Sequence, residues 1–304
     1  MIKKISGLFK PCYVFKPTSL IRRLSLGFSS KKTGTTDLVL PWGSTIAVDP
    51  GEAIGGDIIK QGIFDIAVSE CAWRLIQPGD RVLDVGANIG YMTSLFAARA
   101  GVNGRVHSFE PHPVIRKKLE ANVARFLGNK GSAPIEVHPL ALGSRIETAH
   151  LVETDYFATN QGTATLTDQG QEAAPPAGVV LHPVQVDTLD HLFPTESFSL
   201  LKIDVEGNEG KVIEGARQLL ADKRITNVIY EDHERGRTGL PGVFTSAGYS
   251  VFSIGYTLFG LELRTPDQPV ALDTSWESVN YLATTKPETI RTILGKGWRV
   301  LRGA

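Results

Sequence analysis

The stretch SLLKIDVEGNE combines a strand-like apolar pattern with an unusual density of charge. Lys202, Asp204 and Glu206 alternate with apolar residues along it. A charge buried in a strand costs several kcal/mol unless it is paired or lies at the open end of the strand. Because alternate residues of a strand point to the same side, the three charged side chains are expected on one face. We therefore predict that this strand ends at a ligand site.

A second segment, VLDVGANIGY, reads as a strand, a tight turn and the start of a helix. Gly86 permits the turn and a close ligand approach, and Gly90 permits close packing where the helix leaves the strand. Backbone N–H groups at the helix start favour a negative group. Glu110 comes twenty residues after Gly90, at the end of the next predicted strand. An acid at that place can accept both hydroxyls of a ribose, so the pattern predicts a nucleoside site.

The spacing of this turn favours a ligand smaller than a dinucleotide. A dinucleotide turn has the spacing GxGxxG, which admits a pyrophosphate, whereas Asn88 replaces the second glycine here. S-adenosylmethionine has one ribose, an amino-acid tail and a sulfonium, and it is the natural candidate. Asp84 and the turn would hold its ammonium end and Glu110 its ribose. An NAD-type site and a turn without any ligand are the alternatives.

Strands and helices must alternate to position these residues. Strands are predicted at 81–87, 104–111, 135–143, 200–207 and 226–234, with a closing pair at 249–255 and 278–286. Helices are predicted at 64–76, 90–101, 113–126 and 211–223, and residues 37–56 read as short extended pieces. Such alternation indicates an α/β fold with a mostly parallel sheet and helices on both faces. Ligands of such sheets bind beyond the carboxyl ends of the strands.

At this point the motifs resemble a known family. VLDVGANIGYMT, VHSFEPHP, ALG, VDTLD and LLKIDVEGNEGKVIEGA together resemble the FkbM family of S-adenosylmethionine-dependent methyltransferases, over about residues 60–255. The resemblance implies a Rossmann-like class I methyltransferase fold with a mostly parallel seven-stranded sheet and helices on both faces. It also implies methylation mostly of sugar, polyketide or lipid-linked hydroxyls.

The cofactor residues follow from the same resemblance. The predicted cofactor-binding set is Asp84, Gly86, Ala87, Asn88, Gly90, Tyr91, Glu110, Pro111, Ala141 and Asp204. Many class I enzymes place a polar residue near the adenine after the third strand, but this chain offers only Leu140, Ala141 and Leu142. The adenine would then be held by backbone and apolar contacts.

The charged strand acquires a role in this layout. It lies next to the strand of Asp84, so its end faces the methyl donor. Methyl transfer is an in-line displacement that depends on positioning, and a hydroxyl acceptor must also lose a proton. We predict Asp204 nearest the sulfonium and the acceptor, Glu206 or His233 as the base, and Lys202 paired with an acid. A structural ion-pair network and a divalent Mg²⁺ or Mn²⁺ site that orients a diol are the alternatives, and metal ligands are left unknown.

Composition limits the partners. The 304 residues carry a formal net charge of zero, so nucleic acid is not favoured as a partner of the whole chain. Cys12 and Cys71 lack metal-ligand spacing and read as reduced thiols of a cytoplasmic protein. No apolar run is long enough for a transmembrane helix.

The first 36 residues contain eight Lys and Arg and no acid. A basic arm that packs over the main domain is the favoured interpretation. Peripheral contact of residues 1–30 with an anionic membrane and an organellar leader are alternatives.

These observations predict three segments. Residues 1–56 form a basic arm and lead-in, residues 57–290 the methyltransferase domain, and residues 291–304 a C-terminal tail. Residues 149–198 are an insertion with a loose Ala/Pro/Gly/Gln part, expected to shape the substrate site.

The predicted function is O-methylation of a hydroxyl on a small sugar, glycolipid or polyketide-like acceptor. The alternatives are N- or carboxyl-methylation, RNA methylation that uses the basic arm, and a non-catalytic binding module. The acceptor and the oligomeric state are left open.

Overall fold

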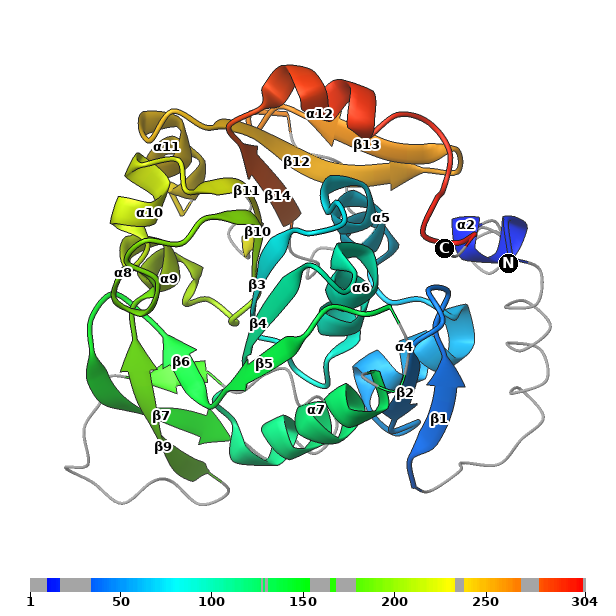
Figure 1. Cartoon of the computed structure of the whole chain (residues 1–304), viewed down its shortest axis with the longest axis horizontal. Helices are drawn as coiled ribbons and strands as arrows, with labels where there is room; N and C mark the ends of the chain where they lie inside the picture. Colours follow the sequence, from blue (N-terminus) through cyan, green and yellow to red (C-terminus); the bar gives the residue numbers. More distant parts are fainter. Residues whose placement is uncertain are drawn as a thin grey trace.

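The computed structural model describes residues 10–16, 34–126, 128, 131–153, 165–167, 179–232, 238–268 and 279–302. A large central sheet lies between two layers of helices (Figure 1). Its strands, in spatial order, are β13 (Gly260–Arg264), β12 (Ser250–Thr257), β14 (Val279–Thr284), β11 (Ile225–Asp232), β10 (Phe198–Ile203), β3 (Arg81–Val85), β4 (Arg105–Phe109) and β5 (Ile135–His138).

The strand directions confirm the predicted fold class. β11, β10, β3, β4 and β5 run parallel, and β14 runs antiparallel to both of its neighbours, β11 and β12. Each of the seven predicted strands contributes one strand to this sheet. An eighth strand, β13, extends the edge as the hairpin partner of β12, and it was not predicted.

Each face of the sheet is covered by its own hydrophobic core. Val82 and Leu200 point to the core beneath one helix layer, whereas their neighbours Leu83 and Leu201 point to the other. The first layer contains α5 (Ile66–Leu75), α6 (Tyr91–Ala100) and α7 (Pro113–Phe126). The second contains α8 (Leu189–Leu192), α9 (Glu209–Glu214), α10 (Arg217–Ala221) and α11 (Leu240–Ser246).

The predicted third strand, 135–143, is in fact two strands in two sheets. β5 stays in the main sheet, and β6 (Leu140–Leu142) pairs with β9 (Val180–Asp187) in a smaller sheet of order β6-β9-β7-β8. Pro139 separates them, and proline cannot donate a ladder hydrogen bond. The other members are β7 (Glu147–Glu153) and β8 (Thr165–Thr167). The Ala/Pro/Gly/Gln-rich part of the insertion lies outside the described residues.

The predicted helix 211–223 is also divided, into α9 and α10. A Cβ on Gly215 would lie 2.0 Å from the carbonyl oxygen of Gly143. The backbone at Gly215, between the two helices, therefore packs directly against the backbone at Gly143, just after β6. Residues 37–56 form a hairpin, β1 (Thr36–Val39) and β2 (Thr45–Val48), and then enter α4 (Ala53–Gln61), a helix that was not predicted.

The end of the chain belongs to the larger core. After α12 (Pro287–Ile293), the side chains of Leu294, Trp298, Val300 and Leu301 are buried in the core that also contains α5. At the other end, α2 (Pro11–Val14) is the described part of the basic arm. Within the described ranges, no helix combines the length and apolar character needed to cross a membrane.

Candidate active site

The turn between β3 and α6 is built on two glycines that no other residue could replace without movement. Gly86 has φ +78°, and a Cβ there would lie 1.8 Å from the carbonyl oxygen of Asp204. Gly90 has φ +92°, and a Cβ there would lie 2.7 Å from Leu119 Cδ1. The turn therefore packs closely against the end of β10 at Gly86 and against α7 at Gly90. This agrees with the predicted tight turn at Gly86 and the predicted close packing at Gly90.

Glu110 lies directly beside this turn. Its two carboxylate oxygens accept one backbone hydrogen bond each, from the N–H of Asn88 and from the N–H of His112, both at 3.0 Å. Burial raises the pKa of Glu110 to about 7, although both backbone hydrogen bonds lower it. Each carboxylate oxygen can accept a further hydrogen bond, so two adjacent hydroxyls can still bind.

Asp84 lies beneath the turn and is fully buried. Its Oδ2 accepts a hydrogen bond from Thr93 Oγ1 at 2.6 Å, and its Oδ1 lies 3.9 Å from Lys202 Nζ. Burial raises the pKa of Asp84, and the nearby charge of Lys202 lowers it. Oδ1 is buried and has no hydrogen-bond partner among the described residues. Contact between Asp84 and the cofactor ammonium group stays a prediction.

Two residues of the predicted cofactor set lie elsewhere than expected. The Tyr91 hydroxyl accepts the N–H of Phe64 at 3.0 Å and lies 3.2 Å from Ser69 Oγ, so this side chain is buried against α5. Ala141 is buried in the small core of the second sheet. Their side chains are occupied by packing, and any contribution to cofactor binding is indirect. Ala87 is buried, and Asn88 and Pro111 are partly exposed on the turn side.

Lys202 links the cofactor turn to the charged end of β10. Its Nζ lies 3.1 Å from Asp204 Oδ2 and donates to the carbonyl oxygen of Gly86 at 3.2 Å. Burial would lower the pKa of Lys202, but the charges of Asp204 and Asp84 outweigh it and raise that pKa. The Lys202 side chain is only 8% exposed, whereas that of Asp204 is 40% exposed. The predicted pairing of Lys202 with an acid is therefore present, and Asp204 is the member that a substrate can reach.

Glu231 completes this group from the neighbouring strand β11. Its carboxyl group is hydrogen-bonded to Asp204. Burial, the charge and hydrogen bond of Asp204, and the charges of Glu206 and Asp65 together raise the pKa of Glu231 to about 10. A hydrogen bond between two carboxyl groups requires a proton on one of them, and burial favours Glu231 as the group that carries it. The sequence analysis gave the base role to Glu206 or His233 and assigned none to Glu231.

Asp65 and Asn280 were missed as site residues. Asp65 precedes α5 with φ 35°, and its side chain accepts the N–H of Val68 at 3.1 Å and the Nδ2–H of Asn280 at 3.1 Å. Desolvation raises the pKa of Asp65, and the charge of Asp204 adds to this effect. An acid just before a helical run is an N-cap signal in sequence. Nothing local in the sequence reveals that this cap faces Asp204.

Two further charged residues complete the comparison with prediction. Glu209, which follows the charged strand, is buried, and its Oε1 accepts the N–H groups of Val205 and Gly207 at 3.1 and 3.2 Å. Its carboxylate shapes the loop after β10, in which Glu206 adopts φ 53°. His233 lies outside the described residues.

The predicted Mg²⁺ or Mn²⁺ site gains no support. In the described part of the chain, the side-chain groups able to hold a metal are His107–Glu136–His138 and His112–Glu153–His182. Neither contains Asp204 or Glu206. The ammonium group of Lys202 occupies the cationic position beside Asp204.

Comparison with known proteins places this site in a family. Residues 84–249 match the methyltransferase FkbM domain. The chain belongs to the FkbM methyltransferase family. It is therefore an S-adenosylmethionine-dependent methyltransferase, as the sequence motifs predicted.

Individual relatives are more distant. The chain is 33% identical over 222 residues to 31-O-demethyl-FK506 methyltransferase FkbM of Streptomyces tacrolimicus, which covers 65% of this chain and 81% of that protein. It is 28% identical over 211 residues to AMB antimetabolite synthetase AmbE of Pseudomonas aeruginosa, of whose length it spans only 10%.

The match to a solved structure, methyltransferase FkbM from Methylobacillus flagellatus, covers 67% of this chain and 43% of that chain. The sequence identity is 15% and the TM-score is 0.41. At that score the overlay adds nothing to the description of the fold.

Proposed function

We propose that this FkbM methyltransferase is an O-methyltransferase that acts on a hydroxyl group of a small sugar, glycolipid or polyketide-like acceptor. The observation that carries the proposal is the partly exposed Asp204 carboxylate beside the cofactor turn, held between the Lys202 ammonium group and the protonated Glu231. A hydroxyl nucleophile needs such an acceptor for its hydrogen bond and proton.

The cofactor would be held by residues that fit its parts. Glu110 presents two carboxylate oxygens for the ribose hydroxyls, and Gly86 keeps the turn free of a side chain. S-adenosylmethionine supplies the electrophilic methyl group of its sulfonium. The carboxylates Asp65, Asp204 and Glu206 form a negative surrounding that stabilises this cation.

Proton transfer would proceed through Asp204. Its carboxylate accepts a hydrogen bond from the acceptor hydroxyl, which aligns the oxygen for in-line attack. Lys202 keeps Asp204 ionised before the reaction. As the oxygen forms its bond to the methyl group, the hydroxyl proton moves to Asp204 and from there to water, because the side chain is partly exposed.

The same carboxylates favour one alternative acceptor and disfavour another. A carboxylate substrate would be repelled by Asp204 and Glu206, so carboxyl methylation is not supported by this surface. A cationic amine would be attracted, which keeps N-methylation as the second candidate. The name of the Streptomyces relative, 31-O-demethyl-FK506 methyltransferase FkbM, indicates O-methylation by that protein, and this favours the hydroxyl.

Two measurements test the proposal. S-adenosylhomocysteine should bind the full chain in isothermal titration, and absence of binding at millimolar ligand would contradict it. Transfer of labelled methyl groups into glycan and lipid extracts should be lost in Asp204→Asn and retained in Glu288→Gln, an exposed acid on α12. Mass and NMR analysis of the labelled product distinguishes a methyl ether from a methylamine, and a methylamine would replace the hydroxyl proposal.

Delivery of the acceptor from a membrane is a separate proposal. It depends on the six Lys and Arg residues between positions 1 and 30, of which Lys10 and Lys16 lie in the described ranges and four do not. The full chain should float with vesicles that contain anionic lipid, and a chain that lacks residues 1–30 should not. Equal flotation of both proteins would remove this role. Retention of the full chain on RNA, lost when residues 1–30 are removed, would instead favour the nucleic-acid alternative.

A further inference from the structure

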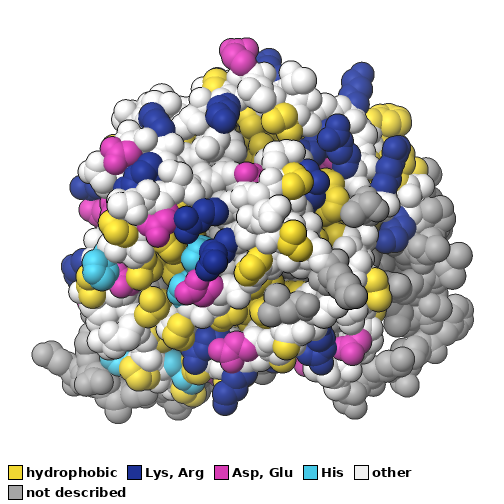
Figure 2. Space-filling model, viewed as in Figure 1, with side chains coloured by type: hydrophobic (Ala, Val, Ile, Leu, Met, Phe, Trp, Pro, Cys, Tyr) yellow, Lys and Arg dark blue, Asp and Glu magenta, His cyan; other side chains and the backbone are white. Residues whose placement is uncertain are grey.

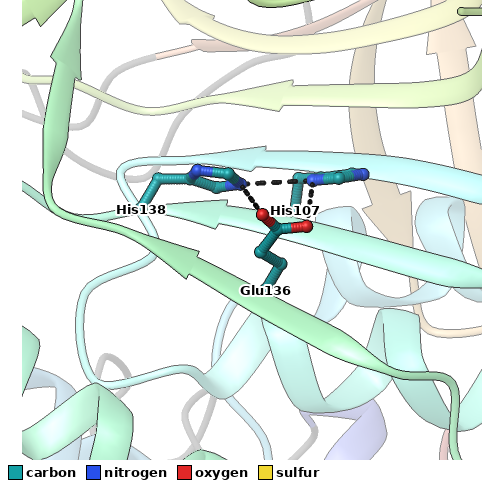
Figure 3. Close-up of side chains that lie close together, drawn as sticks. All are labelled: His107, Glu136 and His138. Carbon is teal, nitrogen blue, oxygen red and sulfur yellow. Dashed lines mark hydrogen bonds and ion pairs between the residues drawn. The ribbon is translucent and has the colours of Figure 1, made fainter.

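Two histidines and a glutamate converge on one face of the main sheet at its edge, and none of them belongs to the group of side chains around Asp204. His107 lies in β4, and Glu136 and His138 lie in β5. Glu136 is paired in register with His107, and His138 with Phe109, two residues further along each strand. Because alternate residues share a face, all three side chains project to the same side of the sheet. Figure 3 shows the two imidazole rings and the carboxylate pointing toward one another.

The donor atoms are spaced as metal ligands are. His107 Nδ1 lies 3.2 Å from His138 Nε2 and 3.4 Å from Glu136 Oε2, and His138 Nε2 lies 3.8 Å from Glu136 Oε1. Two ligands at ~2.05 Å from a tetrahedral Zn²⁺ are roughly 3.3 Å apart. The two nitrogen atoms already have this separation, and a small rotation of the Glu136 side chain would bring its oxygen to the same range.

The site is rigid at its base and open at its mouth. The side chain of His107 is 6% exposed, that of His138 is 18% exposed and that of Glu136 is 53% exposed. Phe193 packs against the His107 ring, with ring centroids 5.0 Å apart, and the His138 ring stacks on Phe109. Over β4 and β5, the face in Figure 2 shows histidine together with acidic and basic side chains at the surface. A cation can therefore arrive from solvent, and a water molecule can take the fourth position.

We propose that His107, Glu136 and His138 bind a Zn²⁺ ion, with His107 Nδ1, His138 Nε2 and a Glu136 oxygen as ligands. Imidazole nitrogen and carboxylate oxygen are both established zinc ligands. Arg105, whose Nη1 lies 3.8 Å from Glu136 Oε2, must give up this contact when the ion binds. The ion would join the edge strand β5 to β4.

The site is connected to the cofactor turn through backbone contacts. The carbonyl oxygen of His138 accepts the N–H of Glu110 at 3.1 Å. The carbonyl oxygen of Phe109, whose ring stacks on His138, accepts the N–H groups of Gly86 and Ala87. Bound zinc would therefore brace the strand ends that position the ribose-binding acid, without contact with the reacting groups.

The second histidine cluster has a different character. His112 Nδ1 accepts the N–H of Val114 at 3.3 Å, so the ring proton of neutral His112 is on Nε2. That nitrogen lies 3.3 Å from Glu153 Oε2, to which His182 Nε2 also comes within 2.7 Å. The protonated Nε2 cannot bind a metal at the same time. This second cluster is thus a hydrogen-bonded bridge that joins His112, the residue before α7, to Glu153 and His182 of the second sheet.

Metal binding by the full chain, with any affinity tag removed, tests the proposal. Titration with Zn²⁺ should show one tight equivalent, and Co²⁺ should give the intense visible absorption of a tetrahedral site. His138→Ala and Glu136→Gln should each weaken Zn²⁺ binding at least tenfold, because each removes one ligand. His191→Ala, an exposed histidine on α8, is the matched control and should bind Zn²⁺ like the unaltered chain.

Three outcomes would overturn the proposal. One is the absence of Zn²⁺ binding by the unaltered chain. Another is equal affinity in His138→Ala and His191→Ala. The third is loss of binding in His182→Ala with retention in His138→Ala, which would move the site to the other cluster. Binding of S-adenosylhomocysteine by each variant verifies that it is folded.

Discussion

Asp204 and Glu231 lie at the ends of neighbouring parallel strands and share a hydrogen bond between their carboxyl groups. Lys202 ion-pairs with Asp204, so the two acids are not equivalent. Asp204 is stabilised as the carboxylate, and Glu231, with a pKa of about 10, keeps the proton. This division of roles leads to a test with two substitutions that look chemically alike.

Asp204→Asn should reduce methyl transfer by about 10²–10⁴-fold, the usual contribution of a general base. Glu231→Gln should retain activity within about threefold, because a glutamine amide can donate to Asp204 as the protonated acid does. Initial rates of labelled methyl transfer measure both. S-adenosylhomocysteine affinity should stay similar in the two variants, and a Glu231→Gln variant as inactive as Asp204→Asn would assign the base role to Glu231.

Glu110 should make cofactor binding pH-dependent. Ribose hydroxyls donate to the ionised carboxylate, and the pKa of about 7 in the free protein means that ionisation is lost as pH falls through this value. If only the ionised form binds, affinity for S-adenosylhomocysteine should fall roughly tenfold between pH 8 and pH 6. Isothermal titration at the two pH values checks this. In Glu110→Gln the affinity should be weaker and nearly constant over the same interval.

The same group should affect the stability of the ligand-free protein in the opposite direction. The pKa of Glu110 is about 7 in the folded chain, above the ordinary value of 4.5. The folded state therefore holds a proton that the unfolded state releases. This contribution is fully present below about pH 4.5 and is lost as pH rises through 7. Urea unfolding of the unaltered chain and of Glu110→Gln at pH 6 and pH 8 isolates the effect. If the unaltered chain gained stability relative to Glu110→Gln as the pH rises, the prediction would be contradicted.

Gly86→Ala should abolish cofactor binding or prevent folding, because its Cβ would collide with the Asp204 carbonyl oxygen. Gly79→Ala is a matched control. Gly79 also has a positive φ, +91° against +78°, but an added Cβ there meets no atom within 4 Å. The comparison separates the close approach from backbone strain. Soluble yield and S-adenosylhomocysteine titration are the measurements, and equal losses in both variants would assign the effect to strain alone.

Glu70→Ala should destabilise the chain by about 3–5 kcal/mol, since it leaves a buried arginine without its partner. Glu70 and Arg74 form a buried ion pair, and Glu70 also accepts the N–H groups of Arg299 and Val300. Arg74 donates to the carbonyl oxygens of Ile293 and Gly297 at 3.0 and 2.7 Å. Chemical denaturation measures the loss, with the exposed Glu288→Ala as the control. A change below 1 kcal/mol would mean that water replaces these contacts.

Local patterns were sufficient for much of this site. The glycine turn, Glu110 and the pairing of Lys202 with an acid were predicted because each depends on residues close together in one strand and loop. The family resemblance implied that the charged strand lies next to the strand of Asp84, and β10 does pair with β3. Asp65 and Asn280 could not be predicted, because their place beside Asp204 depends on how α5 and β14 pack on the sheet.

The wrong boundaries have similar physical causes. Residues 135–143 were read as one strand. Pro139 is a local signal of a break, but the pairing of β6 with the distant β9 is what takes the chain into the second sheet. The division between α9 and α10 depends on contact of Gly215 with Gly143, 72 positions earlier in the sequence. The hydrophobic periodicity and the helix or strand propensities of a segment are local signals, so they do not predict such long-range contacts.

The position of β14 sets the order in which the protein can be completed during synthesis. β14 is the last strand of the chain, yet it lies inside the sheet, between β11 and β12, which precede it. Until residues 279–284 have left the ribosome, β11 and β12 each present an unpaired apolar edge, and the hairpin of β12 and β13 has no place in the sheet. A nascent chain that stops before this strand therefore also lacks Asn280 beside Asp65, and the group of side chains around Asp204 is complete only once residues 279–284 have entered the sheet.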